Sequence, residues 1–251
     1  MQSTNNYPNS IDGYGLAAFN PVNRKWQHYK SNKSPSEDAK SKDIVNHFAE
    51  YPLVIGHLRN ADNMPNILSA KCGNSHPFYY KNHIFVHNGQ FDNANLPVNR
   101  KWFQENILPE YWDNIKGYTD SECVFYLLLS TIQKRKWIYK DVDMLKNRGC
   151  KSPSAFEELR DAVNECFQLL HRKFHSYYAN FIYSDKEYSV VGRLMKNVTE
   201  KNKQNNPLYF SKNGGRILFL TLPFDDTFTL IDWGQIYVIH NITGKMDNYA
   251  I

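Results

Sequence analysis

The order of apolar segments predicts an α+β fold in which two mainly antiparallel sheets stack face to face with helices outside. Strands with inserted helices come first, helices dominate the middle of the chain, and a meander of strands ends it. Regular alternation of helix and strand, the mark of a doubly wound parallel sheet, is missing. With 41% hydrophobic and 15% aromatic residues, the 251 residues can build a packed core. We therefore expect one globular domain over residues 1–251.

The first elements are short apolar runs bounded by Gly or Pro. Residues 16–19 and 53–58 are predicted to be buried strands. Between them, Ser36–Asp38 supplies a capping residue and early acids for a helix that Pro52 closes. The apolar face of this helix should consist of Ile44, Val45, Phe48 and Ala49. Residues 83–87 predict a further strand that ends at the turn signal Asn88-Gly89.

Helices follow in the middle of the chain. Thr119 with Glu122 three residues later forms a capping box ahead of the apolar run 124–129. Ser154 precedes what we expect to be the longest helix, whose apolar residues recur at spacings of three and four up to Phe174.

Strands rich in aromatic and β-branched residues close the chain. They are expected at residues 177–183, 188–191, 216–222, 228–231 and 236–240. Asp185-Lys186 and Trp233-Gly234 are plausible hairpin turns. The polar residues 196–206 are expected to form a loop inserted between strands.

Charge and cysteine usage exclude several classes of protein. The net charge of +5 is scattered, whereas a nucleic-acid partner requires a concentrated basic surface. No apolar stretch reaches the ~20 residues of a membrane span, and the polar N-terminus has no secretory signal. The cysteines lie far apart without CxxC spacing, at Cys72, Cys123, Cys150 and Cys166. We expect reduced thiols in a cytoplasmic protein.

Three clusters of residues could carry chemistry, and each also has an ordinary structural interpretation. Asp12-Gly13-Tyr14-Gly15 is most simply a tight turn before a strand, because two glycines without a following helix are weak evidence of phosphate binding. His57 and Arg59 share one strand face, where a buried Arg needs an anion: a structural salt bridge or a bound ligand. Scattered histidines give no metal-ligand spacing, so no metal and no cofactor is expected.

The third cluster is the stretch that surrounds Asn88-Gly89. The ordinary interpretation is a hairpin turn. The functional one is that the Asn88 amide and the Gly89 backbone N–H stabilise a developing oxyanion, with glycine required so that a substrate can approach.

Taken together, five motifs in order resemble the class II (N-terminal-nucleophile) glutamine amidotransferases, closest to the stand-alone members that act on γ-glutamyl compounds. The motifs run over residues 12–15, 55–61, 74–78, 87–93 and 119–122, and the resemblance covers about half the chain. It implies a four-layer αββα sandwich of the N-terminal-nucleophile hydrolase type. The implied substrate is glutamine or another small γ-glutamyl molecule.

The resemblance also implies roles for individual residues. Arg59 would hold the α-carboxylate of the substrate through a bidentate fork, and Asp120 would pair with its α-ammonium group. Asn88 and Gly89 would form the oxyanion hole, and His76 would shape the site rather than transfer protons. We expect Arg59, Asn88, Gly89 and Asp120 to converge on one cleft.

One feature of the family is missing: its nucleophile is a cysteine at the start of the mature chain, whose own amino group acts as the base. Here the sequence begins Met1-Gln2-Ser3, and the first strand of the family fold has no counterpart. Three explanations remain open. The true start lies upstream and carries the cysteine; the protein is a catalytically inactive relative that binds a ligand or a partner; or Ser3 or Thr4 serves after processing.

The function predicted is therefore hydrolysis of glutamine or a γ-glutamyl amide if an upstream cysteine completes the site. The alternative is a ligand-binding or partner-binding protein without chemistry. An ammonia-accepting subunit, if one is used, would be a separate polypeptide.

Overall fold

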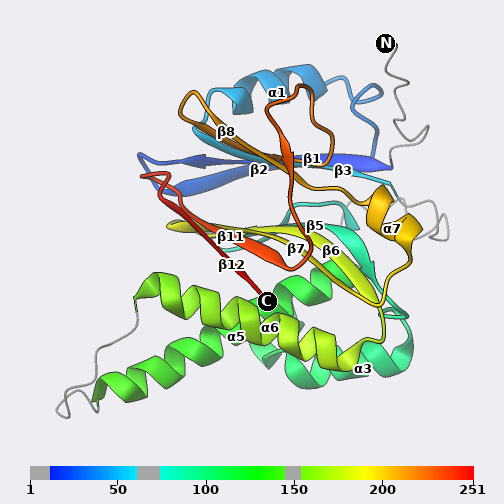
Figure 1. The fold of residues 1–251 in the computed structure, drawn as a ribbon, viewed down its shortest axis with the longest axis vertical. Helices are drawn as coiled ribbons and strands as arrows, with labels where there is room; N and C mark the ends of the chain where they lie inside the picture. Colours follow the sequence, from blue (N-terminus) through cyan, green and yellow to red (C-terminus); the bar gives the residue numbers. More distant parts are fainter. Residues whose placement is uncertain (1–11, 61–73, 145–153) are drawn as a thin grey trace. The chain divides into compact units, whose positions relative to one another are not determined.

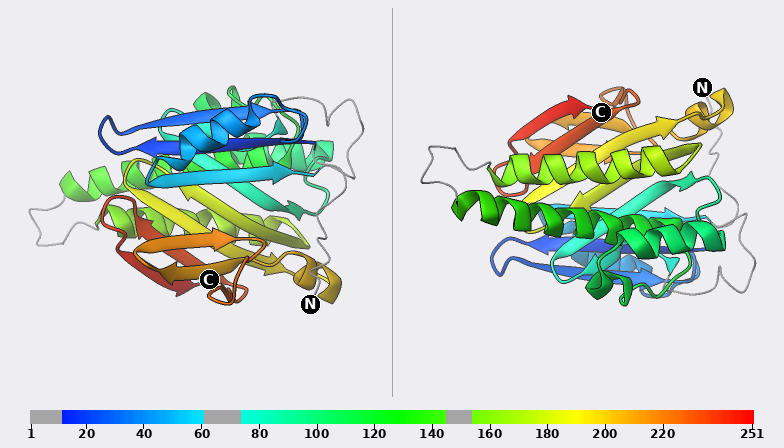
Figure 2. Two further views of the ribbon diagram at one scale, coloured as in Figure 1. Left: turned by 90° about the horizontal axis from the view of Figure 1, so that it is seen from above. Right: turned by 90° about the horizontal axis from the view of Figure 1, so that it is seen from below.

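The computed structural model describes residues 12–60, 74–144 and 154–251, without the side chains of 137–144. The chain divides into two compact units, drawn in Figures 1 and 2. Unit 1 comprises Met1–Val86 with Lys116–Tyr118, and unit 2 comprises His87–Ile115 with Thr119–Ile251. The expectation of a single domain stays a prediction.

Unit 1 is built on a three-stranded antiparallel sheet in the order β2-β1-β3. Its strands are β1 (Gly13–Asn20), β2 (Lys25–Ser31) and β3 (Leu53–Arg59). The register places Leu16 opposite both Tyr29 and Gly56. Buried strands were predicted at 16–19 and 53–58; both strands are present, but only Ile55 and Arg59 of β3 are buried, so the expected burial of the second is wrong. β2 was not predicted, because only Trp26 and Ser31 of its seven residues are buried.

Helix α1 (Ser41–Ala49) begins later than the sequence suggested. Ser34 and Glu37 instead form a turn in which the Ser34 backbone N–H and hydroxyl both donate to the Glu37 carboxylate. The predicted apolar face is also smaller than expected. Phe48 is buried against the sheet, whereas Val45 is 49% exposed. The pattern marked the helix but not its start, because the early polar residues serve the turn.

Strands β4 (Phe78–Tyr80) and β5 (His83–Phe91) form an antiparallel hairpin with Phe78 opposite Phe85. The predicted turn at Asn88-Gly89 is wrong: β5 runs through both residues to Phe91. The turn lies between β4 and β5, where Lys81 takes a positive φ of 54°.

Unit 2 contributes most of a six-stranded sheet in the order β12-β11-β7-β6-β5-β4. Its further strands are β6 (Tyr177–Ser184), β7 (Tyr188–Lys196), β11 (Gln235–His240) and β12 (Met246–Ala250). Helices α5 (Asp120–Met144) and α6 (Ala155–Lys173) pack side by side, as Figure 2 shows. The ring of Phe167 on α6 stacks on Phe181 of β6 at 4.6 Å. The α+β class with mainly antiparallel sheets and helices is confirmed.

The start signals of both long helices are confirmed. The Thr119 hydroxyl accepts the Glu122 backbone N–H at 3.3 Å, and Ser154 with Glu157 forms a complete capping box. The helix that follows Ser154 is not the longest, however, because α5 spans 25 residues and α6 spans 19. Two shorter helices, α3 (Pro97–Asn106) and α4 (Pro109–Trp112), precede α5, each with a proline in its first turn.

The end of the chain differs from the predicted meander. The polar segment after β7 contains a short helix, α7 (Glu200–Asn205), capped by Thr199. A separate small sheet joins β8 (Tyr209–Asn213), β9 (Arg216–Leu220) and β10 (Thr229–Leu230) in the order β10-β8-β9. Trp233-Gly234 is consequently not a hairpin turn, because β10 pairs with β8 while β11 pairs with β7 and β12. The Asp185-Lys186 turn between β6 and β7 is confirmed.

One expectation concerns residues that the structure does not describe. Residues 1–11, where no counterpart of the first strand of the family fold was expected, lie outside the described part. Within the described residues, β3 pairs with β1 alone and its Leu58 is 52% exposed. Across those same residues, no helix is long and apolar enough to cross a membrane.

Candidate functional site

Arg59 closes strand β3 and is almost fully buried, with 5% of its surface exposed. Burial lowers the pKa of its guanidinium, and the nearby Asp12 carboxylate acts in the opposite direction. The Asp12 backbone N–H also donates to the Arg59 carbonyl at 2.9 Å. His57 lies two residues earlier on the same face of β3, as the period of a strand predicts. A buried cation at a strand end is a suitable partner for a carboxylate ligand.

The segment Asn74–Pro77 packs against this part of unit 1. The rings of His57 and His76 lie 4.1 Å apart, and His76 meets Phe78 edge to face at 4.7 Å. Close packing also explains the motif glycines. A Cβ atom on Gly15 would lie 2.1 Å from the His76 carbonyl oxygen, so no side chain fits there. Gly13 and Gly15 belong to β1 itself, and the predicted tight turn is therefore wrong.

Tyr14, the aromatic residue of that motif, ties β1 to the turn ahead of α1. The hydroxyls of Tyr29 and Tyr14 donate to one oxygen of Asp38, at 2.7 and 3.1 Å. The bond from Tyr29, followed by that from the Lys40 backbone N–H, contributes most to lowering the pKa of Asp38 to about 2, and the Tyr14 bond adds to it. Asp38 therefore stays ionised near neutral pH, and it links strands β1 and β2 to the turn ahead of α1.

The second group of candidate residues lies in unit 2. Asn88 is exposed on β5, and Gly89 follows it within the strand. A Cβ atom on Gly89 would lie 2.1 Å from the Tyr178 carbonyl oxygen and 2.5 Å from His87 Nε2. Glycine is thus required by the neighbouring strand β6, which is a different reason from the substrate access that the sequence suggested.

Asp120 begins helix α5, and its carboxylate reaches strand β5. One oxygen accepts the Phe91 backbone N–H at 3.0 Å, and the other accepts the Ser121 backbone N–H at 2.8 Å. Asp120 as a residue is partly exposed. A carboxylate at a helix N-terminus is also favoured by the helix dipole. The Asp120 carboxylate is therefore held at Phe91, which lies two residues after Gly89 on β5.

His87, a buried residue of β5, also connects this strand to helix α5. Its Nδ1 lies 2.9 Å from the Ser121 hydroxyl, which in turn lies 3.3 Å from Asp120 Oδ1. Burial lowers the pKa of His87, while the Asp120 carboxylate and a hydrogen bond to the Tyr178 backbone act to raise it. The imidazole is thus a neutral group within a polar chain.

The two cysteines that the structure describes, Cys123 and Cys166, are both buried and free. Burial raises the pKa of Cys123 to about 12 and raises that of Cys166 further. The Arg100 guanidinium donates to the Cys123 sulfur at 2.9 Å without reversing this shift. A nucleophilic thiol has to ionise near neutral pH, so neither cysteine fits that role.

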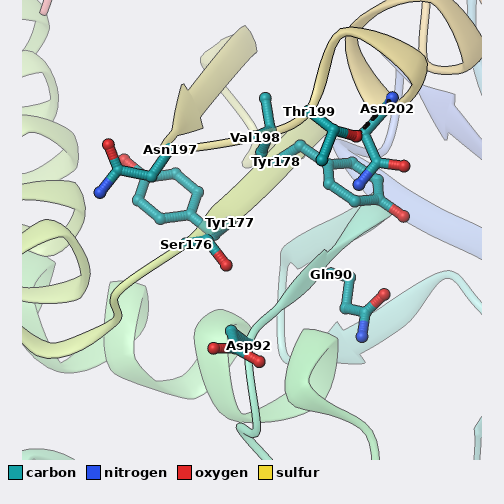
Figure 3. Close-up of a pocket in the computed structure, with 9 residues that line it drawn as sticks. All are labelled: Gln90, Asp92, Ser176, Tyr177, Tyr178, Asn197, Val198, Thr199 and Asn202. Atoms are coloured by element: carbon teal, nitrogen blue, oxygen red, sulfur yellow. Dashed lines mark hydrogen bonds between the residues drawn. The ribbon is translucent and has the colours of Figure 1, made fainter.

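A hollow of about 190 Å³ lies beside the end of β5 (Figure 3). Gln90 lies on the same strand face as Asn88, two residues on. Asp92 is the one charged residue of the lining, which is otherwise made of amides, hydroxyls and a valine. The lining consists of Gln90, Asp92, Ser176, Tyr177, Tyr178, Asn197, Val198, Thr199 and Asn202. Within the described residues, no three His, Cys, Asp or Glu side chains are grouped to hold a metal ion.

Comparison with known proteins decides the family. The sequence pattern of the class II glutamine amidotransferases matches residues 2–165. This chain is a class II glutamine amidotransferase family member. The probable glutamine amidotransferase DUG3 of Saccharomyces cerevisiae is 40% identical over 82 residues, which is 33% of this chain and 21% of that protein. The match thus spans about a fifth of that relative.

Solved structures share the fold at low identity. A glutamine aminotransferase class-II domain protein from Silicibacter pomeroyi has a TM-score of 0.61 at 17% identity, over 94% of this chain and 90% of that one. The glutamine phosphoribosylpyrophosphate amidotransferase from B. subtilis has a TM-score of 0.57 at 15% identity, over 96% and 43%. These likenesses support the layered fold of the amidotransferase family.

Within this family member the predicted site residues fall into two groups. Arg59, His57 and His76 lie together in unit 1, and Asn88, Gly89 and Asp120 lie together in unit 2. Their convergence on one cleft stays a prediction. His87 and Ser121 lie within the motifs at residues 87–93 and 119–122, but the sequence alone assigned them no role. The signal that could have found them is that each directly neighbours a predicted site residue in the sequence: Asn88 for His87 and Asp120 for Ser121.

Proposed function

We propose that this amidotransferase family member binds the α-amino acid portion of glutamine or a small γ-glutamyl amide. Arg59 holds the α-carboxylate, and Asp120 holds the α-ammonium group. The observation that carries the proposal is the carboxylate of Asp120, a partly exposed residue, fixed by Phe91 and Ser121 beside strand β5. Burial of Arg59 supports it from unit 1, because a desolvated guanidinium gains most from a bidentate carboxylate.

Asn88 and Gly89 supply the oxyanion site in this proposal. The Asn88 side chain is exposed on β5 and able to donate through its amide. Two preorganised donors aimed at a developing oxyanion are worth several kcal/mol of barrier lowering, about 3–4 kcal/mol for a single donor. His76 packs against His57 and Phe78, which suits a residue that shapes the site.

Catalysis needs a nucleophile, and the first candidate function holds if an upstream cysteine at the N-terminus of the mature chain supplies it. Its thiolate attacks the γ-amide carbon, the amine leaves with a proton, and water then cleaves the thioester to give glutamate. Cys123 and Cys166 are buried with raised pKa values and do not serve. Cys72, Ser3 and Thr4 lie outside the described residues.

The second candidate function is a protein that binds a γ-glutamyl ligand or a partner without chemistry. It is favoured by the two described cysteines, which are buried with raised pKa values, while the Asp120 carboxylate is held by the Phe91 backbone N–H. We place the protein in the cytoplasm, without cofactor, metal, nucleic acid or membrane. A separate ammonia-accepting subunit remains part of the first candidate.

Calorimetric titration of the 251-residue chain with L-glutamine tests the proposal. We expect binding, and we expect Arg59→Met and Asp120→Asn each to weaken it by about tenfold or more, since a bond to a charged group is worth about 1.5–3 kcal/mol. Arg216→Met and Asp247→Asn remove exposed charges and serve as matched controls. No binding by the wild-type chain, or equal binding by Asp120→Asn, would overturn the proposal.

Ammonia release from glutamine separates the two candidate functions. The 251-residue chain is expected to release ammonia far more slowly than a complete enzyme, because binding and oxyanion residues alone retain little of the rate. A form that begins with an added N-terminal cysteine segment should be active if the first candidate holds. Robust release by the 251-residue chain itself would direct attention to Ser3, Thr4 or Cys72.

A further inference from the structure

Ser121 sits between a buried histidine and the candidate ammonium-binding acid. Its hydroxyl lies 2.9 Å from His87 Nδ1 and 3.3 Å from Asp120 Oδ1, and its backbone N–H donates to the same Asp120 oxygen at 2.8 Å. His87 and Ser121 are 2% and 5% exposed. The chain of contacts therefore runs from the protein interior to the partly exposed residue Asp120.

The direction of these bonds follows from the number of protons. A serine hydroxyl has one proton to donate and can accept two bonds. Burial lowers the pKa of His87, so the ring is neutral and carries one proton. The Ser121 hydroxyl donates to Asp120 Oδ1 at 3.3 Å, so its oxygen is left to accept from the neutral His87 ring, whose Nδ1 lies 2.9 Å away.

The consequence for Asp120 is a carboxylate that is fixed in place but not saturated. Its Oδ2 accepts the Phe91 backbone N–H and its Oδ1 accepts both the backbone N–H and the hydroxyl of Ser121, which leaves part of the roughly four acceptor sites of a carboxylate unused. A carboxylate with spare acceptor capacity binds an ammonium group better than one whose lone pairs are all taken. The His87 ring also lies close to Gly89, so it neighbours the proposed oxyanion site as well as Ser121.

We propose that His87 and Ser121 are positioning residues that orient the Asp120 carboxylate toward the α-ammonium group of the substrate. The inference rests on the proposed function, in which Asp120 binds that group. It gives the pair a role in selectivity for α-amino acids, beyond the packing that any buried pair supplies. A purely apolar pair could fill the same space without a buried polar group, so a buried polar chain here fits a functional role.

The test compares L-glutamine with 4-carbamoylbutanoate, which is the same amide without the α-ammonium group. The wild-type chain is expected to prefer L-glutamine, and Asp120→Asn is expected to lose that preference. Ser121→Ala should lower the preference by about tenfold, through weaker binding of L-glutamine with little change for the des-amino analogue. His87→Phe keeps a ring in place and breaks the same link from its other end, so it should lower the preference similarly.

Ser130→Ala is the matched control, because Ser130 is a buried serine of the same helix whose hydroxyl donates to Tyr126. It should leave the preference unchanged. The double variant His87→Phe/Ser121→Ala should be no worse than either single variant, since both remove one link. A purely structural role would weaken both ligands equally.

The outcomes separate the two proposals. If the wild-type chain shows no preference, or Asp120→Asn keeps it, the proposed function fails. If Asp120→Asn loses the preference while Ser121→Ala and His87→Phe keep it, the proposed function stands and this inference is overturned.

Discussion

The candidate residues of unit 1 and unit 2 are held in different ways. In unit 1, His76 packs ring to ring with His57 and Phe78, and Arg59 is desolvated. In unit 2, hydrogen bonds from backbone and side chains hold Asp120. A packed side chain is sensitive to substitutions that change its volume, whereas a hydrogen-bonded side chain is sensitive to substitutions that remove its polar atoms. The two halves of the proposed site should therefore fail under different substitutions.

The largest effects are expected where both halves share a constraint, at Gly15 and Gly89. In each, an added Cβ atom would lie 2.1 Å from a backbone carbonyl oxygen, that of His76 or Tyr178. Gly15→Ala and Gly89→Ala should each lower the free energy of unfolding by about 3 kcal/mol or more, at the upper end for overpacking. Urea denaturation measures this change.

Gly214→Ala is the control for that experiment. No atom lies within 4 Å of the added Cβ, and only the positive φ of 56° opposes the change. Its cost should be about 1 kcal/mol. If Gly89→Ala costs no more than this, the close approach of β5 and β6 does not constrain the site.

The packed half should tolerate loss of polarity but not loss of volume. His76→Phe keeps a ring against His57 and Phe78, so glutamine binding should change by less than about threefold. His76→Ala removes the ring and should lower the free energy of unfolding by about 2 kcal/mol, as large-to-small changes at buried sites do. Denaturation and calorimetry on both variants check this. If His76→Phe abolishes binding without unfolding the protein, His76 takes part through its nitrogens.

The smallest expected effects are losses of stability as the pH falls. The lowered pKa of His87 means that the unfolded chain binds its proton first, so stability falls as pH drops below the ordinary value of 6.5. Asp38 has the opposite sign of charge: its contribution is present above its ordinary pKa of 3.8 and is lost as pH falls towards about 2. Unit 2 should therefore weaken in the range in which unit 1 still keeps its Asp38 contribution.

Amide hydrogen exchange at several pH values can follow β5 and β1 separately. Because the pKa of His28 in unit 1 is also lowered by burial, the informative quantity is the difference between wild type and variant. His87→Phe should remove part of the loss in β5 below pH 6.5, and Tyr29→Phe should reduce the later loss in β1. An unchanged profile in His87→Phe would show that this histidine is not neutral in the fold.

A feature of this site could be predicted from the sequence only where the residues that produce it lie close together along the chain. Capping at Thr119 and Ser154 follows from residues three positions apart, so both helix starts were predictable. The role of Gly89 was not, because the colliding carbonyl belongs to Tyr178, far along the chain. For the same reason Asn88-Gly89 resembled a turn although it lies in a strand, and the links of Asp120 to His87 and Phe91 required the folded neighbours.

The central proposal is that the carboxylate of the ligand binds Arg59 and its ammonium group binds Asp120. Nuclear magnetic resonance of the labelled chain, titrated with L-glutamine, tests it most directly. The account predicts saturable shifts with one dissociation constant at both the Arg59 side chain and the Phe91 backbone amide, which donates to Asp120. Shifts confined to one unit, or two different dissociation constants, would contradict it.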